Sequence, residues 1–375
     1  GIFSFVYINL KTEQIFMVRD FTGTKPLYYL CNNKDLFFSS EAWFLYSLSN
    51  KELDKKSVNF FLNFGFTEEE KTLIKNVNKV KPRYIYDFNL SSNTLNKKLY
   101  FNLSKLKSFK KPNVEDSKEL LENTIKKNLI TDTKIGTFLS GGVDSTTVSL
   151  IAKKYNENIE AITTCFLPND KFKKFNMDFE FSNKISKDYN FKLHVHYVND
   201  EKDLYDDFIK VTNYLDEPVS NLNFLHTYWQ TKLAKENNIK VVLTGDGADE
   251  LFCGYDRYKS AYLAKKLSFL SFFSKKISRI NKLGNNEVPL YYYSIFKNNE
   301  HKDIFKNLND LDNNLSDEIY DNFSSDYKID YINYFDTRYW LTNESNYKLD
   351  KCSMINSVEA RVPFLDHKLI EFVLS

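Results

Sequence analysis

The stretch Ile135-Gly136-Thr137-Phe138-Leu139-Ser140-Gly141-Gly142-Val143-Asp144-Ser145 joins a short apolar run to a glycine-rich turn. The apolar run is typical of a buried strand, and the residues after the turn have the pattern of a helix. Two adjacent glycines let the backbone turn tightly and approach an anion with no Cβ in the way. A helix that begins there offers unpaired N–H groups and the positive end of its dipole. The stretch therefore predicts a phosphate-binding loop between a strand and a helix.

The hydroxyls of Ser140 and Ser145 can donate further hydrogen bonds to a phosphate. The Asp144 carboxylate suits the Mg²⁺ that accompanies a nucleotide. A bare Ser-Gly-Gly is more often an ordinary capped turn, but the six-residue form directly after a strand is much rarer by chance. The loop also differs from the GxxxxGK[ST] loop that handles γ-phosphate transfer. These residues predict a nucleotide site of a different kind.

A second informative segment, residues 241–255, reads VVLTGDGADELFCGY. It has the pattern of a buried strand that ends in an acidic loop. Asp246, Asp249 and Glu250 would repel one another unless a cation lies among them. A solvated acidic turn is the alternative, and the buried strand that precedes it argues against that alternative. Because ligands of open α/β sheets bind beyond the carboxyl ends of the strands, both loops are expected at one edge.

The SGGVDS string resembles the PP-loop of ATP pyrophosphatases, which split ATP into AMP and pyrophosphate. With residues 241–255 and the segment SVEARVPFLDH at 357–367, the chain resembles glutamine-hydrolysing asparagine synthetases and close relatives that amidate another carboxylate. The resemblance implies an α/β fold in which a doubly wound parallel sheet is followed by a helical C-terminal part. It also implies ATP and Mg²⁺.

The resemblance assigns roles to individual positions. Asp246 is a candidate to accept a proton from ammonia, and Lys351 to stabilise the charged transition state. An ordinary surface lysine is the alternative for Lys351. Glu359 and Arg361 are expected to pair and to position a helix at the edge of the site. The ATP, pyrophosphate and Mg²⁺ ligands that it implies are Ser140, Gly141, Gly142, Asp144, Ser145 and Gly245 for the nucleotide, and Asp144 and Asp249 for Mg²⁺.

Residues 1–95 form a block with a different pattern. Alternating runs at 3–8, 15–18, 27–30 and 36–39 predict an antiparallel sheet, with helices near 41–48 and 57–63. Residues 19–29, RDFTGTKPLYY, closely resemble the later part of class II glutamine amidotransferase domains. The resemblance implies an α+β sandwich whose nucleophilic cysteine lies upstream of this chain. Cys31 cannot replace it, because that chemistry needs the free α-amino group of residue one.

We therefore expect a fragment that consists of a truncated amidotransferase domain (1–95), a polar linker (96–112) and a synthetase domain (113–375) truncated at its C-terminus. Within the last part, apolar periodicity predicts a helix from 114 towards 130. Strands are expected at 135–139, 159–165, 191–198 and 240–244, alternating with helices at 145–155, 177–189, 204–214 and 224–236. This alternation is typical of a parallel, doubly wound sheet. Residues 255–375 are expected to be largely helical.

The composition excludes several other classes. The 375 residues carry a net charge of +2, and neither nucleic acid nor an acidic membrane surface is implied as a partner. The basic residues are expected to be spread over the surface rather than gathered in a patch. The four cysteines show no metal-ligand spacing and are expected to be reduced in a cytoplasmic protein.

These features favour ATP-dependent conversion of aspartate to asparagine through β-aspartyl-AMP, with ammonia from glutamine. The partners are then small molecules: aspartate, glutamine or ammonia, and ATP. The family is frequently dimeric, so a homodimer is possible. Two alternatives stay open at this point: an amidotransferase acting on a sugar acid or a peptide carboxylate, and a non-catalytic binding protein derived from a synthetase.

Overall fold

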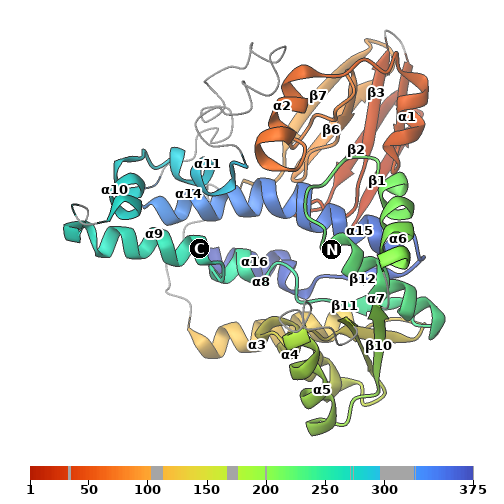
Figure 1. Ribbon diagram of the computed structural model, residues 1–375. Helices are drawn as coiled ribbons and strands as arrows, with labels where there is room; N and C mark the ends of the chain where they lie inside the picture. Colours follow the sequence, from red (N-terminus) through yellow and green to blue (C-terminus); the bar gives the residue numbers. More distant parts are fainter. Residues whose placement is uncertain are drawn as a thin grey trace.

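The computed structural model describes residues 1–32, 35–102, 113–166, 176–198, 201–270, 272, 274–295, 325 and 327–374. An antiparallel β part lies at one end of the molecule and a parallel sheet at the other (Figure 1). Between the two lies a long helical run that consists of α14 (Lys328–Phe335), η5 (Asp336–Ser345) and α15 (Asn346–Met354).

The N-terminal part contains two antiparallel sheets where the sequence predicted one. The first has the order β1 (Ser4–Asn9), β2 (Gln14–Arg19), β6 (Tyr84–Asn89), β7 (Thr94–Leu99). The second has the order β4 (Asp35–Ser39), β3 (Tyr28–Asn32), β5 (Val77–Lys79). Apolar side chains of both sheets share one core, which includes Met17, Tyr29 and Tyr86. Helix α1 (Ala42–Leu48) packs on the second sheet, and α2 (Lys55–Phe64) follows.

The predicted linker begins too early. Residues 96–99 belong to β7, which pairs along its length with β6. Their side chains are mostly polar and exposed because β7 is an edge strand of the sheet. The rest of the predicted linker, from 103 to 112, lies outside the described residues.

The C-terminal part contains a five-stranded parallel sheet, which confirms the prediction of a doubly wound fold. Five strands run in the order β10 (Leu193–Val198), β9 (Glu160–Phe166), β8 (Ile135–Phe138), β11 (Val241–Leu243), β12 (Glu359–Arg361). Each adjacent pair is parallel. The connecting helices are α3 (Val114–Asn128), α4 (Val143–Tyr155), α5 (Met177–Asp188), α6 (Glu201–Tyr214) and α7 (Phe224–Glu236). The strand order reverses between β8 and β11, which is where such folds bind ligands.

The segment around Glu359 is a strand, within a part of the chain that was expected to be largely helical. Residues 359–361 pair in parallel with β11, and this long-range pairing overrides the local pattern. The predicted ion pair is confirmed, because Arg361 Nε lies 2.9 Å from Glu359 Oε1. Arg361 also donates to the carbonyl of Asn128 at 2.7 Å, which ties the strand to the end of α3.

The remaining elements are helical, as expected. They are α8 (Ala248–Phe252), α9 (Asp256–Lys266), η3 (Ser268–Leu270), α10 (Lys275–Lys282), α11 (Glu287–Tyr293), η6 (Pro363–Leu365) and α16 (His367–Leu374). No helix in the described ranges is both long and apolar enough to cross a membrane. Cys31, Cys165, Cys253 and Cys352 are free cysteines in the structure.

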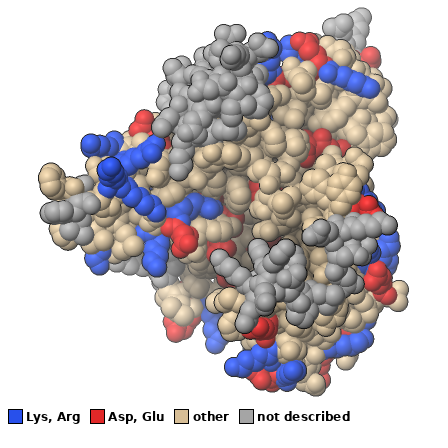
Figure 2. Space-filling view, in the orientation of Figure 1, with Lys and Arg blue, Asp and Glu red and all other residues tan. Residues whose placement is uncertain are grey.

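Positive charge is less evenly distributed than the sequence suggested. Residues 257–286 contain no Asp or Glu, and their basic residues are Arg257, Lys259, Lys265, Lys266, Lys275, Lys276, Arg279 and Lys282. Figure 2 shows a cluster of blue side chains over this end of the molecule, where α9 and α10 lie. The clustering arises because both helices belong to the same projecting arm (Figure 1).

Candidate functional site

The two loops singled out in the sequence meet at the reversal point of the sheet. The glycine-rich loop follows β8 and the acidic loop follows β11, and these strands pair in parallel with Val242 opposite Gly136. The loops touch at Gly245, where a Cβ atom would lie only 2.7 Å from the backbone nitrogen of Ser145. Glycine is therefore required at position 245 for the second loop to approach the first.

The backbone of the glycine-rich loop has the form of an anion cradle. Gly141 has φ +80°, and a Cβ there would collide with Phe181 of α5 at 2.4 Å. Gly142 is the N-cap residue of α4. The hydroxyls of Ser140 and Ser145 lie 2.8 Å apart, and Ser140 Oγ accepts from the Gly142 N–H at 3.3 Å. These donors now bond within the loop, and the same donors can turn to a phosphate.

A single cavity of about 460 Å³ collects the predicted residues except Gly141 and Lys351. Its walls come from both loops, from the end of β9, from α7 and from the helical run η5–α15. The lining residues with polar side chains or glycine in the two loops are Ser140, Gly142, Asp144, Ser145, Thr244, Gly245, Asp246, Gly247, Asp249 and Glu250.

The carboxylates in this cavity influence one another. Burial and the neighbouring charge of Asp249 raise the pKa of Asp144. Burial also raises the pKa of Asp249, which Arg257 opposes and Asp246 reinforces. Burial and mutual repulsion therefore both disfavour the charged forms of these two carboxyl groups. Gly254 gives the Asp249 carboxylate room, because a Cβ there would lie 2.0 Å from its Oδ1.

This pair of carboxylates fits Mg²⁺. The ion is usually bound through one or two carboxylates together with substrate phosphates, rather than by an all-protein cage. The described residues contain no group of three or more His, Cys, Asp or Glu that could hold a metal ion. Asp144 and Asp249 offer the two hard oxygen donors, and the glycine-rich loop lies beside them.

Lys351 does not line this cavity, which corrects the sequence assignment. Its side chain is 1% exposed and pairs with Asp216 and Glu41. Burial alone would lower the pKa of Lys351, but the two carboxylates reverse the effect and raise it. Lys348, one turn earlier on α15, lines the cavity and lies 3.2 Å from Glu344 Oε1. Among the described residues that line the cavity, Lys348 is the one Lys or Arg.

Other cavity residues were not predicted from the sequence. Thr163, Thr164 and Phe166 come from the end of β9, and His226 comes from α7. Thr164 Oγ1 lies 2.9 Å from His226 Nδ1, and burial lowers the pKa of His226, so its ring is neutral at pH 7. These residues carry no local motif. The sequence indicates them only indirectly. A strand of this sheet must end beside the glycine-rich loop, so residues at that strand end are candidates to line the site.

Glu250 is a further acidic side chain of the cavity. The Tyr255 hydroxyl donates to its Oε1 at 2.8 Å. Burial raises the pKa of Glu250 to about 8, and nearby Asp336 contributes in the same direction. Glu250 is therefore mostly protonated at neutral pH.

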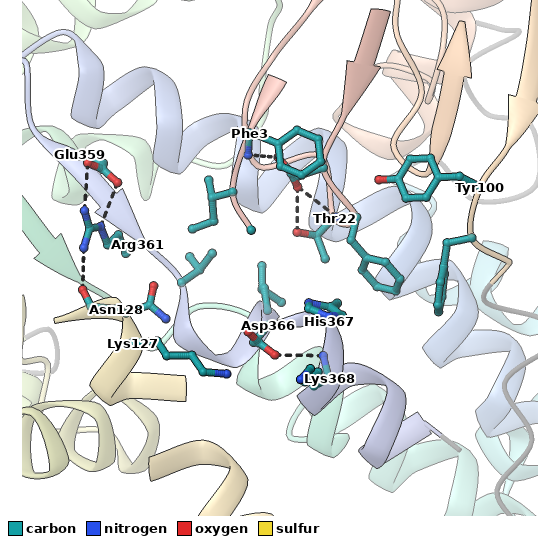
Figure 3. A pocket seen from close by; sticks show the side chains of 17 residues that line it. Phe3, Thr22, Tyr100, Lys127, Asn128, Glu359, Arg361, Asp366, His367 and Lys368 are labelled. Carbon is teal, nitrogen blue, oxygen red and sulfur yellow. Dashed lines mark hydrogen bonds and ion pairs between the residues drawn. The ribbon is translucent and has the colours of Figure 1, made fainter. Parts of the chain in front are cut away.

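A larger cavity of about 720 Å³ lies elsewhere, between the antiparallel part and the end of the parallel sheet. Figure 3 shows Thr22 and Tyr100 on one side of it and Arg361 and Asp366 on the other. None of the residues predicted to bind ATP or Mg²⁺ lines it. Size alone therefore does not identify the chemical site in this molecule.

Two family models match this chain. Residues 116–375 match the asparagine synthase family, and residues 1–101 match the glutamine amidotransferase domain. The fold is a doubly wound parallel sheet with a glycine-rich loop and an acidic loop at its reversal point. With more than half of its length matched, the chain belongs to the asparagine synthase family.

Individual relatives are distant. The chain is 26% identical to glutamine-hydrolysing asparagine synthetase 1 of Bacillus subtilis, over 98% of this chain and 60% of that protein. It is 30% identical to a putative glutamine-hydrolysing asparagine synthetase 2 of Methanocaldococcus jannaschii, over 74% of this chain and 55% of that protein. A solved NH₃-dependent NAD synthetase from Campylobacter jejuni overlaps 41% of this chain and 61% of its own, with 18% identity and a TM-score of 0.26. The chain thus spans about three fifths of the length of the curated relatives.

Proposed function

We propose that this chain carries out the synthetase half of a glutamine-dependent amidation. ATP activates the side-chain carboxylate of aspartate as β-aspartyl-AMP, and ammonia converts this intermediate to asparagine. The observation that supports the proposal is the meeting of three parts in one cavity. These parts are the glycine-rich loop, the carboxylates of the acidic loop, and the ammonium of Lys348 on α15.

In the first step, a carboxylate oxygen attacks the α-phosphorus of ATP and the bond to the bridging oxygen of pyrophosphate breaks. This reaction needs positioning and charge neutralisation more than covalent help from the protein. The Ser140 and Ser145 hydroxyls and the N–H groups of the glycine-rich loop would hold the departing pyrophosphate. Mg²⁺ held by Asp144 and Asp249 would neutralise phosphate charge. We assign to Lys348 the role that the sequence assigned to Lys351, because Lys348 lines the cavity and Lys351 does not.

In the second step, the nitrogen of ammonia bonds to the acyl carbon and AMP leaves with the pair of electrons of the broken C–O bond. The attacking nitrogen must also lose a proton. We assign that proton to the carboxylate of Asp246, which lines the same cavity. Glu250 is a poorer acceptor, because burial raises its pKa to about 8 and keeps it protonated.

The wider assignments follow from this proposal. Residues 113–375 would form the synthetase domain. The match of residues 1–101 to an amidotransferase domain supports glutamine as the source of ammonia in the whole protein. The four free cysteines suit a cytoplasmic location, and a homodimer stays a prediction.

The test is release of pyrophosphate and AMP from ATP with ammonia as nitrogen donor. Aspartate is compared with glutamate, a uronic acid and a peptide that ends in a free carboxylate, each at the same concentration. We expect aspartate to give the highest kcat/KM and asparagine to be the product. Release with another acid alone would assign a different acceptor. No AMP with any acid, despite ATP binding, would favour a non-catalytic role.

A further inference from the structure

The RDFTGTKP segment at residues 19–26 has no role in the chemistry above, although it is among the clearest motifs of the chain. It forms the turn between β2 and β3. Rather than facing solvent, this turn lies against the helical run η5–α15. Two hydrogen bonds and an ion pair connect the turn to that run.

The turn is rigid because two buried charged side chains organise its backbone. Arg19 donates to the carbonyls of Lys25 at 2.8 Å, Gly23 at 2.7 Å and Val80 at 2.9 Å. The Asp20 carboxylate accepts from the N–H groups of Thr22, Thr24 and Lys25 at 2.9 to 3.1 Å, and from that of Phe3 at 3.3 Å. A turn with so many internal bonds presents its outer atoms in a fixed arrangement.

The outer atoms of the turn bind one stripe of the helical run. The carbonyl oxygen of Thr22 accepts from Thr342 Oγ1 and from Asn346 Nδ2, both at 3.0 Å. Lys25 Nζ lies 2.7 Å from Asp350 Oδ1. The bound positions 342, 346 and 350 are four apart and therefore lie along one side of the run.

Contact is close at Gly23, which has φ +65°. A Cβ at this position would lie 2.8 Å from Thr342 Cγ2 and 2.6 Å from Pro82 Cγ. Glycine is required both by the backbone angle and by the approach of the helix. The turn and the helix are thus complementary in shape as well as in hydrogen bonds.

Lys348 lies on the opposite side of α15 from the residues that the turn binds. Successive residues of an α-helix are separated by about 100° around its axis, so Lys348 lies about 200° from both Asn346 and Asp350. One side of α15 is therefore bound by the turn, and the opposite side presents Lys348 to the cavity. The preceding segment η5 is wound as a π-helix, a form that is rare and frequent at functional sites.

We propose that the RDFTGTKP turn fixes the axial and rotational position of α15, so that Lys25 and Thr22 of the N-terminal domain position Lys348 in the synthetase site. The N-terminal domain then has a second role besides supplying ammonia, as part of the scaffold of the adenylation step. Lys25, Asp350 and Thr342 are positioning residues, since none of them lines the cavity. The inference rests on the proposed function.

The experiment uses the full-length protein, with ammonia as nitrogen donor and aspartate as acceptor. Lys25→Met, Asp350→Asn, Thr342→Val and the double variant Lys25→Met/Asp350→Asn are compared with wild type. The readouts are kcat for pyrophosphate release, the Kd of ATP and Tm. Lys75→Met is the control, because Lys75 is exposed and forms its ion pair with Glu52 inside the same domain.

We expect Lys25→Met and Thr342→Val to lower kcat by about 10- to 100-fold, because small displacements of a catalytic group have effects of this size. The Kd of ATP should stay within about twofold, since the loops that bind it are untouched. Removing both members of this partly buried pair should restore Tm, as no charge is left unpaired, while kcat stays low. Lys25→Arg should recover most of kcat, and Lys75→Met should match wild type.

Two results would overturn the inference. One is a kcat within twofold of wild type in Lys25→Met and Thr342→Val. The other is recovery of kcat together with Tm in the double variant, which would make the contact purely structural. If wild type itself released no pyrophosphate, the proposed function would fail instead, so the two failures are distinguishable.

Discussion

Lys348 and Lys351 lie three residues apart on α15, yet their ammonium groups belong to different parts of the molecule. Lys348 lines the cavity beneath the glycine-rich loop. Lys351 is buried and ion-paired with Asp216 and Glu41, so it joins α15 to the N-terminal domain and to the segment after α6. The two lysines should therefore respond to substitution in opposite ways.

Lys348→Ala should impair catalysis and leave folding nearly intact. If its ammonium neutralises charge that builds up only during attack on the α-phosphate, its loss raises the barrier without weakening ATP binding. The expected reduction in the rate of adenylate formation is about 10²–10³-fold. Pyrophosphate release and the Kd of ATP measure the two effects separately. An unchanged rate would remove Lys348 from the mechanism.

Lys351→Met should destabilise the protein, because it leaves the buried carboxylate of Asp216 without its partner. Loss of one member of a buried pair costs about 3–5 kcal/mol. Chemical denaturation should show this loss as a lower midpoint. Molecules that remain folded should keep most of their catalytic rate. A variant with wild-type stability and a hundredfold slower rate would restore the role first assigned to Lys351 from sequence.

The contrast between these lysines shows what the sequence can and cannot predict. The glycine-rich loop and the acidic loop were predicted because each combines a buried strand with residues that have few uses other than binding an anion or a cation. Residues 345–351 contain two lysines within one helical turn, and nothing in the local sequence pattern distinguishes them. Which one faces the cavity depends on the rotation of α15, and contacts with residues hundreds of positions away set that rotation.

The same reasoning accounts for the errors in the fold. Glu359 and Arg361 carry no strand signal of their own, and they become β12 because β11 offers an unpaired edge. Residues 94–99 are too polar to read as a strand, and β7 forms because β6 pairs with it while its side chains face water. Local patterns predicted some edge strands, such as β1 and β10, but missed β7, β12 and the central strand β6, which form through pairing with distant strands.

Asp144→Asn should weaken Mg²⁺-dependent binding of ATP. The substitution keeps the shape of the side chain but removes one of the two charged oxygen donors proposed for the ion. We expect at least a tenfold rise in the Kd of Mg·ATP by calorimetry, with little change in Tm. Asp132→Asn, at an exposed position before β8, is the matched control and should bind as wild type does. Equal affinities for all three proteins would contradict the metal assignment.

Two glycines of the site should behave differently when changed to alanine. Gly142 has ordinary angles, and an added Cβ would meet nothing closer than Ser140 Oγ at 3.4 Å. Gly142→Ala should therefore fold normally and lose ATP affinity, because the methyl group would lie where the phosphate approaches.

At Gly245 the Cβ would meet the backbone of Ser145, so Gly245→Ala should destabilise the fold by about 1–3 kcal/mol. Thermal unfolding and ATP titration separate the two; a loss of stability at Gly142 and none at Gly245 would contradict the loop geometry.

Glu250 should contribute a loss of stability as pH rises from about 4.5 to 8. Burial raises the pKa of this carboxyl to about 8 in the folded protein, from an ordinary value of 4.5. Between these two pH values the unfolded chain has released the proton while the folded chain retains it, so each step in pH favours unfolding. The slope from a single such group is at most about 1.4 kcal/mol per pH unit.

Glu250→Gln should make the free energy of unfolding less dependent on pH in this window. Part of the slope should remain, because burial also raises the pKa of Asp336, to about 7. Urea titrations at pH 5, 6, 7 and 8 test this, and an identical slope in wild type and Glu250→Gln would show that Glu250 is ionised in the folded protein.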